Sequence, residues 1–340
     1  MPAFLAVRLN ADTYPVDPRE CVELEQADAK LLALEGETEQ DIIQAARHCD
    51  ALLVISAKVS APVIEALSRC RVLSRLGAGT DRIDVRSATE RGIVVANVPD
   101  FCVNEQAEHA MALLLGWARQ LPFMLDAMKQ GNWNARHHPL VHRLAGRTVG
   151  LVGFGASAQG VAQRCSAFGV QLLAWARHPE KYRDKAQSLG VELVSLDDLL
   201  TRADFVSIHL PLNDETRGVI GHAQLARMKP TAVLINTARG AIVDEAALIA
   251  VLREHRIGGA ALDVFDTLDV FSARTPQPPT HPLLELDNVL LTPHCAGSSV
   301  ESTADSKIRG ARNAALVLQG RWPAHLVNPG VIPRFPLAER

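Results

Sequence analysis

The stretch Arg147–His178, RTVGLVGFGASAQGVAQRCSAFGVQLLAWARH, decides the fold of this chain. It opens with the apolar run Thr148–Val152, which is typical of a strand buried on both faces of a parallel sheet. Gly153 and Gly155 follow, and Ala158 takes the third position of a G-x-G-x-x-G/A pattern. Helical sequence and a second apolar strand come next. The order of strand, turn, helix and strand predicts a dinucleotide-binding unit.

The turn carries the residues expected to contact this dinucleotide. The first glycine permits a tight turn, the second lets the backbone approach a pyrophosphate, and the small third residue lets helix pack on strand. The N-terminus of the helix would offer free N–H groups and a positive dipole end to a phosphate. Alone, the pattern is equally compatible with an ordinary tight turn. The contacts expected here are Gly153, Gly155, Ala156, Ser157 and Ala158.

The end of the second strand, Gln171–Trp175, bears on which dinucleotide binds. In NAD-binding versions an acid stands at this place and binds the ribose 2′-OH, whereas here Ala176 occupies it. Arg177 and His178 follow. Loss of the carboxylate and gain of a cation favour a ribose with a 2′-phosphate, so NADP is the expected cofactor and NAD the alternative. The structural alternative is an exposed arginine that touches nothing.

The bulk composition narrows the class of protein. A chain of 340 residues is long for one hydrophobic core and comfortable for two. A net charge of −3 and a pI near 6.5 give no electrostatic basis for binding nucleic acid or an anionic membrane. No apolar run is long enough to span a bilayer, and the first residues lack a signal-peptide pattern. Six scattered cysteines are typical of free thiols in a reducing cytoplasm.

The order of elements predicts two domains. Strands and helices alternate through the first hundred residues, and long helices are expected at about 104–119 and 300–319. We expect a Rossmann-type doubly wound parallel sheet, residues 100–296, inserted in a smaller flavodoxin-like α/β substrate domain. The smaller domain would consist of residues 1–99 and a C-terminal return, 297–340.

The segment 122–143 is mixed in character and contains His137, His138 and His142. Three histidines close in sequence suggest a zinc site, but no acid or cysteine completes one there. We therefore expect a solvated or interface loop, and no metal site in the chain.

Polar residues stand where four of the expected strands end. Ligands gather beyond the carboxyl ends of strands in an open parallel sheet, and these places are held by His209, Arg239, Asp263 and His294. The guanidinium of Arg239 could grip a carboxylate through a bidentate fork, or could pair with a structural acid. Histidine titrates near neutrality, so His294 could take a hydroxyl proton as a hydride leaves the same carbon. A lone histidine is more often structural.

Six motifs follow one another in a fixed order: Gly77–Asp81, the G-x-G-x-x-A turn, His209–Leu212, Asn236–Gly240, Ala261–Phe265 and Thr292–His294. Together they resemble the D-isomer-specific 2-hydroxyacid dehydrogenases, a family that includes phosphoglycerate dehydrogenases, glyoxylate/hydroxypyruvate reductases and phosphite dehydrogenases. The resemblance spans about Asp50–Gly320. It implies a nucleotide domain inserted in a substrate domain, and a homodimer.

The resemblance also implies a role for particular residues. Arg239 would anchor the substrate, and His294 would be the catalytic acid and base. Backbone at Ala78 and Gly79 would hold the substrate carboxylate, and Asp263 would meet the nicotinamide carboxamide. The further cofactor contacts that we expect are Arg177, His178, His209, Pro211, Thr216, Thr237, Ala238, His294 and Gly297.

One position departs from the family pattern. Members carry a glutamate three residues after the Asp-Val-Phe phenylalanine, hydrogen-bonded to the catalytic histidine, and here Leu268 stands there. The partner that orients the imidazole and stabilises its charged form is thereby lost. Either Asp266 or Asp269 substitutes, or His294 works with a lower pKa, or the protein is not an enzyme. Asp269 adjoins the lost position and is the preferred substitute.

The leading hypothesis is an NAD(P)-dependent D-2-hydroxyacid dehydrogenase, an NADPH-preferring reductase of glyoxylate or hydroxypyruvate type. One alternative is a nucleotide-binding regulatory protein in which Leu268 marks lost catalysis, although Arg239 and His294 are both retained. A second is a phosphite dehydrogenase-like enzyme, which the longer segment 270–280 resembles. Against it, Ala78 stands in a loop where that relative carries a lysine.

Overall fold

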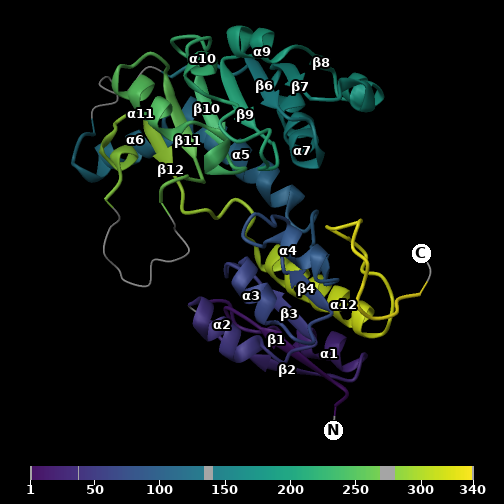
Figure 1. The fold of residues 1–340 in the computed structure, drawn as a ribbon. Helices are drawn as coiled ribbons and strands as arrows, with labels where there is room; N and C mark the ends of the chain where they lie inside the picture. The colour runs from purple at the N-terminus through teal and green to yellow at the C-terminus, as the bar shows by residue number, and fades with distance from the viewer. Residues whose placement is uncertain (1, 37, 134–140, 269–279, 339–340) are drawn as a thin grey trace. The chain divides into compact units, whose positions relative to one another are not determined.

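The chain divides into two compact units, each with its own parallel sheet (Figure 1). The structure, a computed structural model, describes residues 2–36, 38–133, 141–268 and 280–338. The first unit combines Met1–Cys102 with Ser299–Arg340, and the second is formed by Val103–Ser298.

The second unit is built on a seven-stranded sheet in the order β12-β11-β10-β9-β6-β7-β8. The strand before the glycine-rich turn, β6, lies inside the sheet, and the chain winds outward from it in both directions. This arrangement confirms the predicted Rossmann-type doubly wound sheet. Its strands are β6 (Thr148–Val152), β7 (Gln171–Trp175), β8 (Val191–Leu193), β9 (Phe205–Ile208), β10 (Val233–Asn236), β11 (Gly259–Leu262) and β12 (Val289–Leu291).

Helices cover both faces of this sheet, which explains the unbroken apolar character of its strands. Val149 and Leu151 pack in the core beneath α5, α7 and α8, whereas Val152 faces the opposite core beneath α9, α10 and α11. The helices of the unit are α5 (Val103–Ala118), α6 (Leu121–Lys129), α7 (Ala156–Cys165), α8 (Arg183–Ser188), α9 (Leu196–Arg202), α10 (His222–Leu225) and α11 (Glu245–Arg253).

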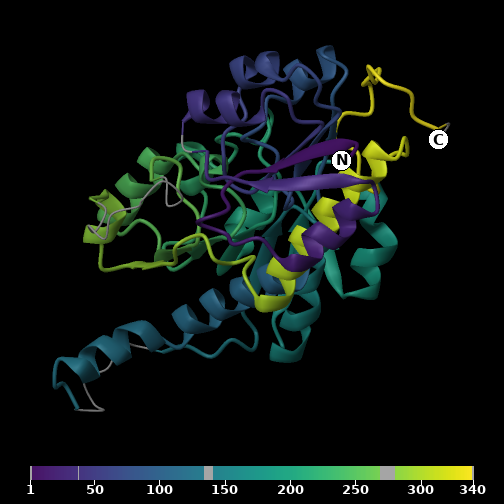
Figure 2. The same cartoon turned by 90° about the horizontal axis from the view of Figure 1, so that it is seen from below.

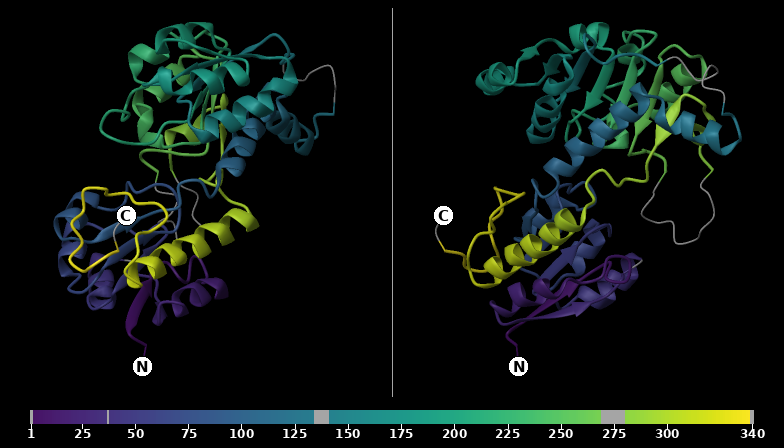
Figure 3. Two further views of the ribbon diagram at one scale, coloured as in Figure 1. Left: turned by 90° about the vertical axis from the view of Figure 1, so that its right-hand side faces the viewer. Right: turned by 180° about the vertical axis from the view of Figure 1, so that it is seen from behind.

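The first unit has a five-stranded parallel sheet in the order β2-β1-β3-β4-β5, which is the flavodoxin-like order predicted for the smaller domain. Helices α1 and α12 cover one face, and α2, α3 and α4 cover the other. Figure 3 shows α12 along one face of this sheet. The elements are β1 (Phe4–Arg8), α1 (Pro18–Glu25), β2 (Ala29–Ala33), α2 (Glu39–Ala46), β3 (Ala51–Val54), α3 (Ala61–Ala66), β4 (Val72–Arg75), α4 (Val85–Glu90), β5 (Val94–Ala96) and α12 (Val300–Leu318).

Two helices illustrate where local sequence signals succeed and fail. Thr38 and Asp41 form a capping box at the start of α2, a pattern that two residues three apart make recognisable in the sequence. The segment from 122 to 143 was expected to be a loop, and this is wrong for its first part, where α6 extends the chain after α5 (Figure 2). Pro122 stands in the first turn of α6, where a missing N–H costs nothing, so the proline starts the helix rather than preventing one.

Among the helices of the described residues, none is both long enough and apolar enough to cross a membrane.

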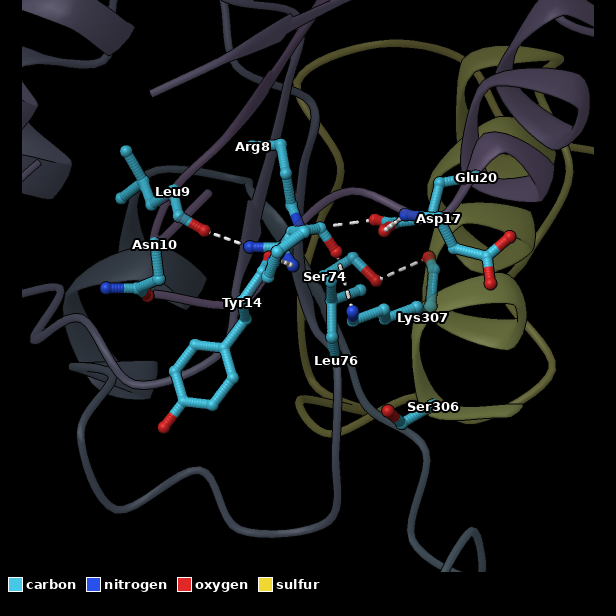
Figure 4. A network of polar contacts seen from close by, with 12 residues as sticks. Arg8, Leu9, Asn10, Tyr14, Asp17, Glu20, Ser74, Leu76, Ser306 and Lys307 are labelled. Carbon is cyan, nitrogen blue, oxygen red and sulfur yellow. Dashed lines mark hydrogen bonds and ion pairs between the residues drawn. The ribbon is translucent and has the colours of Figure 1, made fainter. Parts of the chain in front are cut away.

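A buried ion pair ties the first strand of the small sheet to the first helix (Figure 4). The side chains of Arg8 and Glu20 are fully buried, and Arg8 Nε lies 3.1 Å from Glu20 Oε2. Arg8 Nη2 also donates to the carbonyl of Tyr14 at 3.1 Å, and Glu20 Oε1 accepts from the amide of Asp17 at 2.9 Å. Burial lowers the pKa of Arg8, and the charge of Glu20 opposes that shift. The pair therefore holds the loop between β1 and α1 from both sides.

We expect Glu20→Leu to lower the free energy of unfolding by about 3–5 kcal/mol, because it leaves the guanidinium of Arg8 buried without its countercharge. Urea denaturation followed by circular dichroism measures the change. Glu25→Leu, at an exposed position at the end of the same helix, is the matched control and should cost less than about 0.5 kcal/mol. Arg8→Met combined with Glu20→Leu should recover much of the loss. Equal midpoints for Glu20→Leu and Glu25→Leu would contradict this account.

Candidate active site

The glycine-rich turn connects β6 to α7 and leaves room above itself. Gly153 has φ +97, and a Cβ there would lie 2.6 Å from the carbonyl oxygen of His209, so only glycine fits. A Cβ on Gly155 would meet no atom within 4 Å. Gly155 is also the N-cap of α7, and no side chain caps the helix. The turn thus presents an open surface beside an uncapped helix N-terminus, which is the arrangement that suits a phosphate.

A neutral histidine lies beside this turn. His209 Nδ1 is 3.2 Å from the hydroxyl of Ser157, and its Nε2 is 2.9 Å from the hydroxyl of Ser207. Desolvation lowers the pKa of His209 to about 4, so the ring carries no charge at neutral pH. Both hydroxyls can donate or accept, and they therefore satisfy either tautomer of the ring. Any positive potential at the turn then comes from the helix N-terminus and not from this imidazole.

Arg177, the cation expected to contact the 2′-phosphate of the ribose, has an acidic partner. Arg177 follows β7, its side chain is 61% exposed, and it forms an ion pair with Glu215, which is 58% exposed. His178 Nδ1 lies 3.5 Å from Glu180. The structural alternative of an arginine that touches nothing is therefore wrong. The loop that carries Glu215 is held internally, since the hydroxyl of Thr216 donates to the carbonyl of Pro211 at 2.6 Å.

Four neighbouring strands bring their polar end residues to one edge of the large sheet. His209 follows β9, Arg239 comes three residues after β10, Asp263 follows β11 directly, and His294 comes three residues after β12. Because β12, β11, β10 and β9 are adjacent and parallel, their carboxyl ends share this edge. The structure thus places the four residues that the sequence singled out at the ends of neighbouring strands.

The loop that presents Arg239 is fixed by its own backbone. The side-chain amide of Asn236 donates to the carbonyl of Arg239 at 2.9 Å, and its oxygen accepts from the amide of Ala238 at 3.0 Å. A Cβ on Gly240 would lie 2.0 Å from the carbonyl carbon of Phe265, so this position also requires glycine. The segment after β11 therefore packs directly against the segment that carries the guanidinium.

Asp263 organises the segment that carries His294. Its carboxylate is fully buried, and Oδ1 accepts from the Thr292 hydroxyl at 2.6 Å and from the Cys295 amide at 2.9 Å. Oδ2 accepts from the Ala296 amide at 2.8 Å, and the carbonyl of Asp263 accepts from the amide of His294 at 2.8 Å. His294 itself has φ 55, a left-handed conformation that is uncommon for histidine. These bonds hold the backbone on both sides of His294 and so offset that strain.

Of the two aspartates considered as substitutes for the missing glutamate, only Asp266 lies within the described residues. Its side chain is exposed and has no hydrogen bond or ion pair with His294 in the part of the chain that the structure covers. Its amide donates to Glu245 Oε2 at 2.9 Å. Asp269 lies outside the described residues.

Glu245 is a residue that the sequence reasoning missed. It stands at the start of α11, and its carboxylate binds the Thr267 hydroxyl and lies 3.2 Å from His281 Nε2. His281 is 2.9 Å from the same hydroxyl and is buried. Hydrogen bonds from the neighbouring groups outweigh burial and lower the pKa of Glu245. Thr267 and His281, which flank the segment that contains Asp269, thus both contact the carboxylate of Glu245. An acid in the first turn of a helix is so common that its sequence offered no signal of this role.

In the first unit, two residues of the loop after β4, Ala78 and Gly79, have their carbonyl groups bound and their amides available. The side chain of Asn97 donates to the carbonyl of Ala78 at 2.7 Å, and Arg75 Nε donates to that of Gly79 at 3.1 Å. Within the described residues, the amides of Ala78 and Gly79 donate to no protein acceptor. Two adjacent free N–H groups at the carboxyl end of a parallel sheet are suited to an anion.

Comparison with known proteins agrees with the motifs. The family model described as "D-isomer specific 2-hydroxyacid dehydrogenase, NAD binding domain" matches residues 111–296. A glyoxylate reductase of Korarchaeum cryptofilum is 39% identical over 295 residues, which cover 86% of each chain. A D-3-phosphoglycerate dehydrogenase of Methanocaldococcus jannaschii is 38% identical over 307 residues, 89% of this chain and 56% of the longer relative.

Among solved structures, a similar fold is found in the NADPH-dependent glyoxylate/hydroxypyruvate reductase of Sinorhizobium meliloti in complex with NADP and malonate. Its TM-score is 0.82 at 29% identity, with 98% of this chain and 100% of that chain covered. The chain therefore belongs to the D-isomer-specific 2-hydroxyacid dehydrogenase family, whose members are nicotinamide-dependent oxidoreductases that act on the CH–OH group of their donors.

Proposed function

We propose that the protein is a reductase of small 2-keto acids of the glyoxylate or hydroxypyruvate type, with NADPH preferred over NADH. The main supporting observation is that Arg239 and His294 follow strands of the same parallel sheet in which β6 leads into the open dinucleotide turn, so that all three lie at its carboxyl end. The similarity to glyoxylate reductases over most of both chains supports the substrate class.

The proposed cofactor site runs from the turn to the strand ends. The uncapped start of α7 and the space at Gly155 suit a pyrophosphate, and Arg177 suits a 2′-phosphate. When bound, the nicotinamide supplies the hydride that C2 of the substrate accepts. We assign the remaining contacts to the residues expected from the motifs, namely Ala156, Ser157, Ala158, His178, His209, Pro211, Thr216, Thr237, Ala238, Asp263, His294 and Gly297.

Substrate binding rests on two kinds of donor in this proposal. Arg239 holds the substrate carboxylate through a bidentate fork. In the first unit, the free amides of Ala78 and Gly79 are suited to bind a carboxylate. His294 gives a proton to the carbonyl oxygen as C2 is reduced, and takes it back in the reverse reaction. Asp263 keeps the backbone of His294 in place.

We also propose a homodimer. Helix α6 exposes Leu121, Leu125 and Met128 at the spacing that puts side chains on one helical face, and Trp133 beyond it is 75% exposed. A face of this kind is expected to be covered by a second copy of the chain.

A regulatory protein that binds the dinucleotide without turnover is the second candidate, and Leu268 at the position of the family glutamate favours it. Steady-state turnover of 2-keto acids distinguishes the two functions directly.

The first test is a screen of 2-keto acids with NADPH and NADH side by side. We expect turnover of glyoxylate or hydroxypyruvate, with a higher kcat/KM for NADPH. Arg177→Ala should raise the KM for NADPH and leave NADH nearly unchanged, whereas Glu215→Gln should lower the KM for NADPH because it releases Arg177 from its ion pair. Arg202→Ala, which breaks a comparable exposed pair with Glu192, is the control. Better use of NADH by the wild type would rule out the 2′-phosphate assignment.

The second test concerns the carboxylate clamp. Arg239→Lys keeps the charge but loses the planar fork, so kcat/KM for the keto acid should fall by well over tenfold. Arg253→Lys, on the exposed end of α11, should leave it unchanged. A loss below about tenfold, or ~1.4 kcal/mol, would mean that Arg239 does not bind the carboxylate.

The third test asks which acid serves His294. Reduction requires the protonated imidazole, and a nearby carboxylate favours that form, so kcat persists to higher pH when such a partner exists. We expect Asp269→Asn to move the alkaline limb of the kcat profile to lower pH. Asp266→Asn should leave the profile unchanged, because Asp266 makes no bond to His294. Identical profiles for both variants and the wild type would show that no aspartate replaces the glutamate.

A further inference from the structure

Three potential metal ligands converge beside His294 from distant parts of the chain. They are His109 on α5, Asp263 after β11 and Cys295 after β12, and their ligand atoms all lie within 4.8 Å of one another. All three belong to the second unit. Their separation in the sequence gives none of the short spacings by which metal sites are recognised.

The separations match the edges of a small coordination sphere. His109 Nε2 is 3.6 Å from Asp263 Oδ1, and Cys295 Sγ is also 3.6 Å from that oxygen. Zinc bonds of about 2.0–2.3 Å in a tetrahedron place neighbouring ligands about 3.3–3.6 Å apart. Two of the three edges are therefore already close to the required length. The third edge, between the ligand atoms of His109 and Cys295, is no longer than 4.8 Å.

A fourth oxygen and an open side complete the environment. The hydroxyl of Thr292 lies 3.0 Å from His109 Nε2 and 2.6 Å from Asp263 Oδ1. Asp263 is fully buried, whereas His109 and Cys295 are partly exposed. An ion can thus enter from the side of the imidazole and the thiol. Burial raises the pKa of the Cys295 thiol, and the ion has to displace its proton.

We propose that His109, Asp263 and Cys295 bind one thiophilic divalent cation of the zinc class. Imidazole, carboxylate and thiolate form a mixed set that suits Zn²⁺, and the thiolate disfavours Mg²⁺ and Ca²⁺. The set is completed by the Thr292 hydroxyl or by water.

The bound ion has a direct consequence for the neighbouring segment. Asp263 Oδ1 accepts from Thr292 and from the Cys295 amide, and these bonds hold the backbone around His294. An ion on this oxygen competes with them and alters the position of His294. Cation binding is therefore inhibitory, an expectation that rests on the proposed reductase function.

The test measures binding in the purified full chain without substrate, so that its result does not depend on reductase activity. Zn²⁺ is titrated by calorimetry, and Co²⁺ is used as a spectroscopic probe of thiolate ligation. We expect one ion per chain and a thiolate-to-cobalt charge-transfer band. Loss of an outer-shell partner alone commonly weakens metal binding about ten- to a hundredfold. Cys295→Ser and His109→Gln should therefore each weaken it at least about tenfold, and Cys295→Ser should remove the band.

Two controls separate this site from adventitious binding. Cys21→Ser removes a partly exposed thiol elsewhere, and the triple substitution His137→Ala, His138→Ala and His142→Ala removes the histidine cluster. Both should retain the band and the affinity. If Cys295→Ser and His109→Gln bind as the wild type does, or if the triple variant alone loses binding, the proposed site is wrong. Should Cys295→Ser fail to fold, His109→Gln decides the matter by itself.

Discussion

The candidate active site depends on one buried carboxylate. Asp263 is fully enclosed, and a charge so placed is tolerable only when its oxygens are satisfied. The donors that satisfy it, from Thr292, Cys295 and Ala296, all come from the segment around His294. The hydrogen bonds that the buried carboxylate requires therefore also fix the backbone on both sides of His294, whose φ is unusual. Replacing Asp263 would therefore remove all of these bonds to the segment around His294, and not only one contact.

Much of the fold could be predicted because its strands are apolar on both faces. Runs such as Thr148–Val152 end sharply at a glycine, and their order along the chain implies a parallel sheet. The capping box of α2 belongs to the same recognisable kind of signal, since it depends on two residues three apart. Helix α6 was not, because a proline in its first turn resembles a helix breaker when the start of the helix is unknown.

Only part of the candidate site could be predicted from the sequence. Residues that directly follow strands, such as Arg239 and Asp263, can be located because parallel strands end at one edge. His109 cannot, because it stands within a helix and lies 183 residues from Thr292, its hydrogen-bonding partner. Glu245 was missed because its role depends on Thr267 and His281, which no periodic pattern connects. Contacts that depend on packing across the sheet leave no local trace in the sequence.

The division of the first unit into two chain segments has a consequence for the order of folding. Its core includes Ala314 and Val317 of α12 packed with Ala6 and Leu53 of the sheet. On the ribosome, the strands of this sheet emerge before the second unit, whereas α12, the helix that covers one of their faces, is made only after it. The second unit, by contrast, is contiguous and can complete its core earlier. The sheet of the first unit is therefore made before the second unit but completes its core only after it, and one of its apolar faces stays uncovered by α12 during that interval.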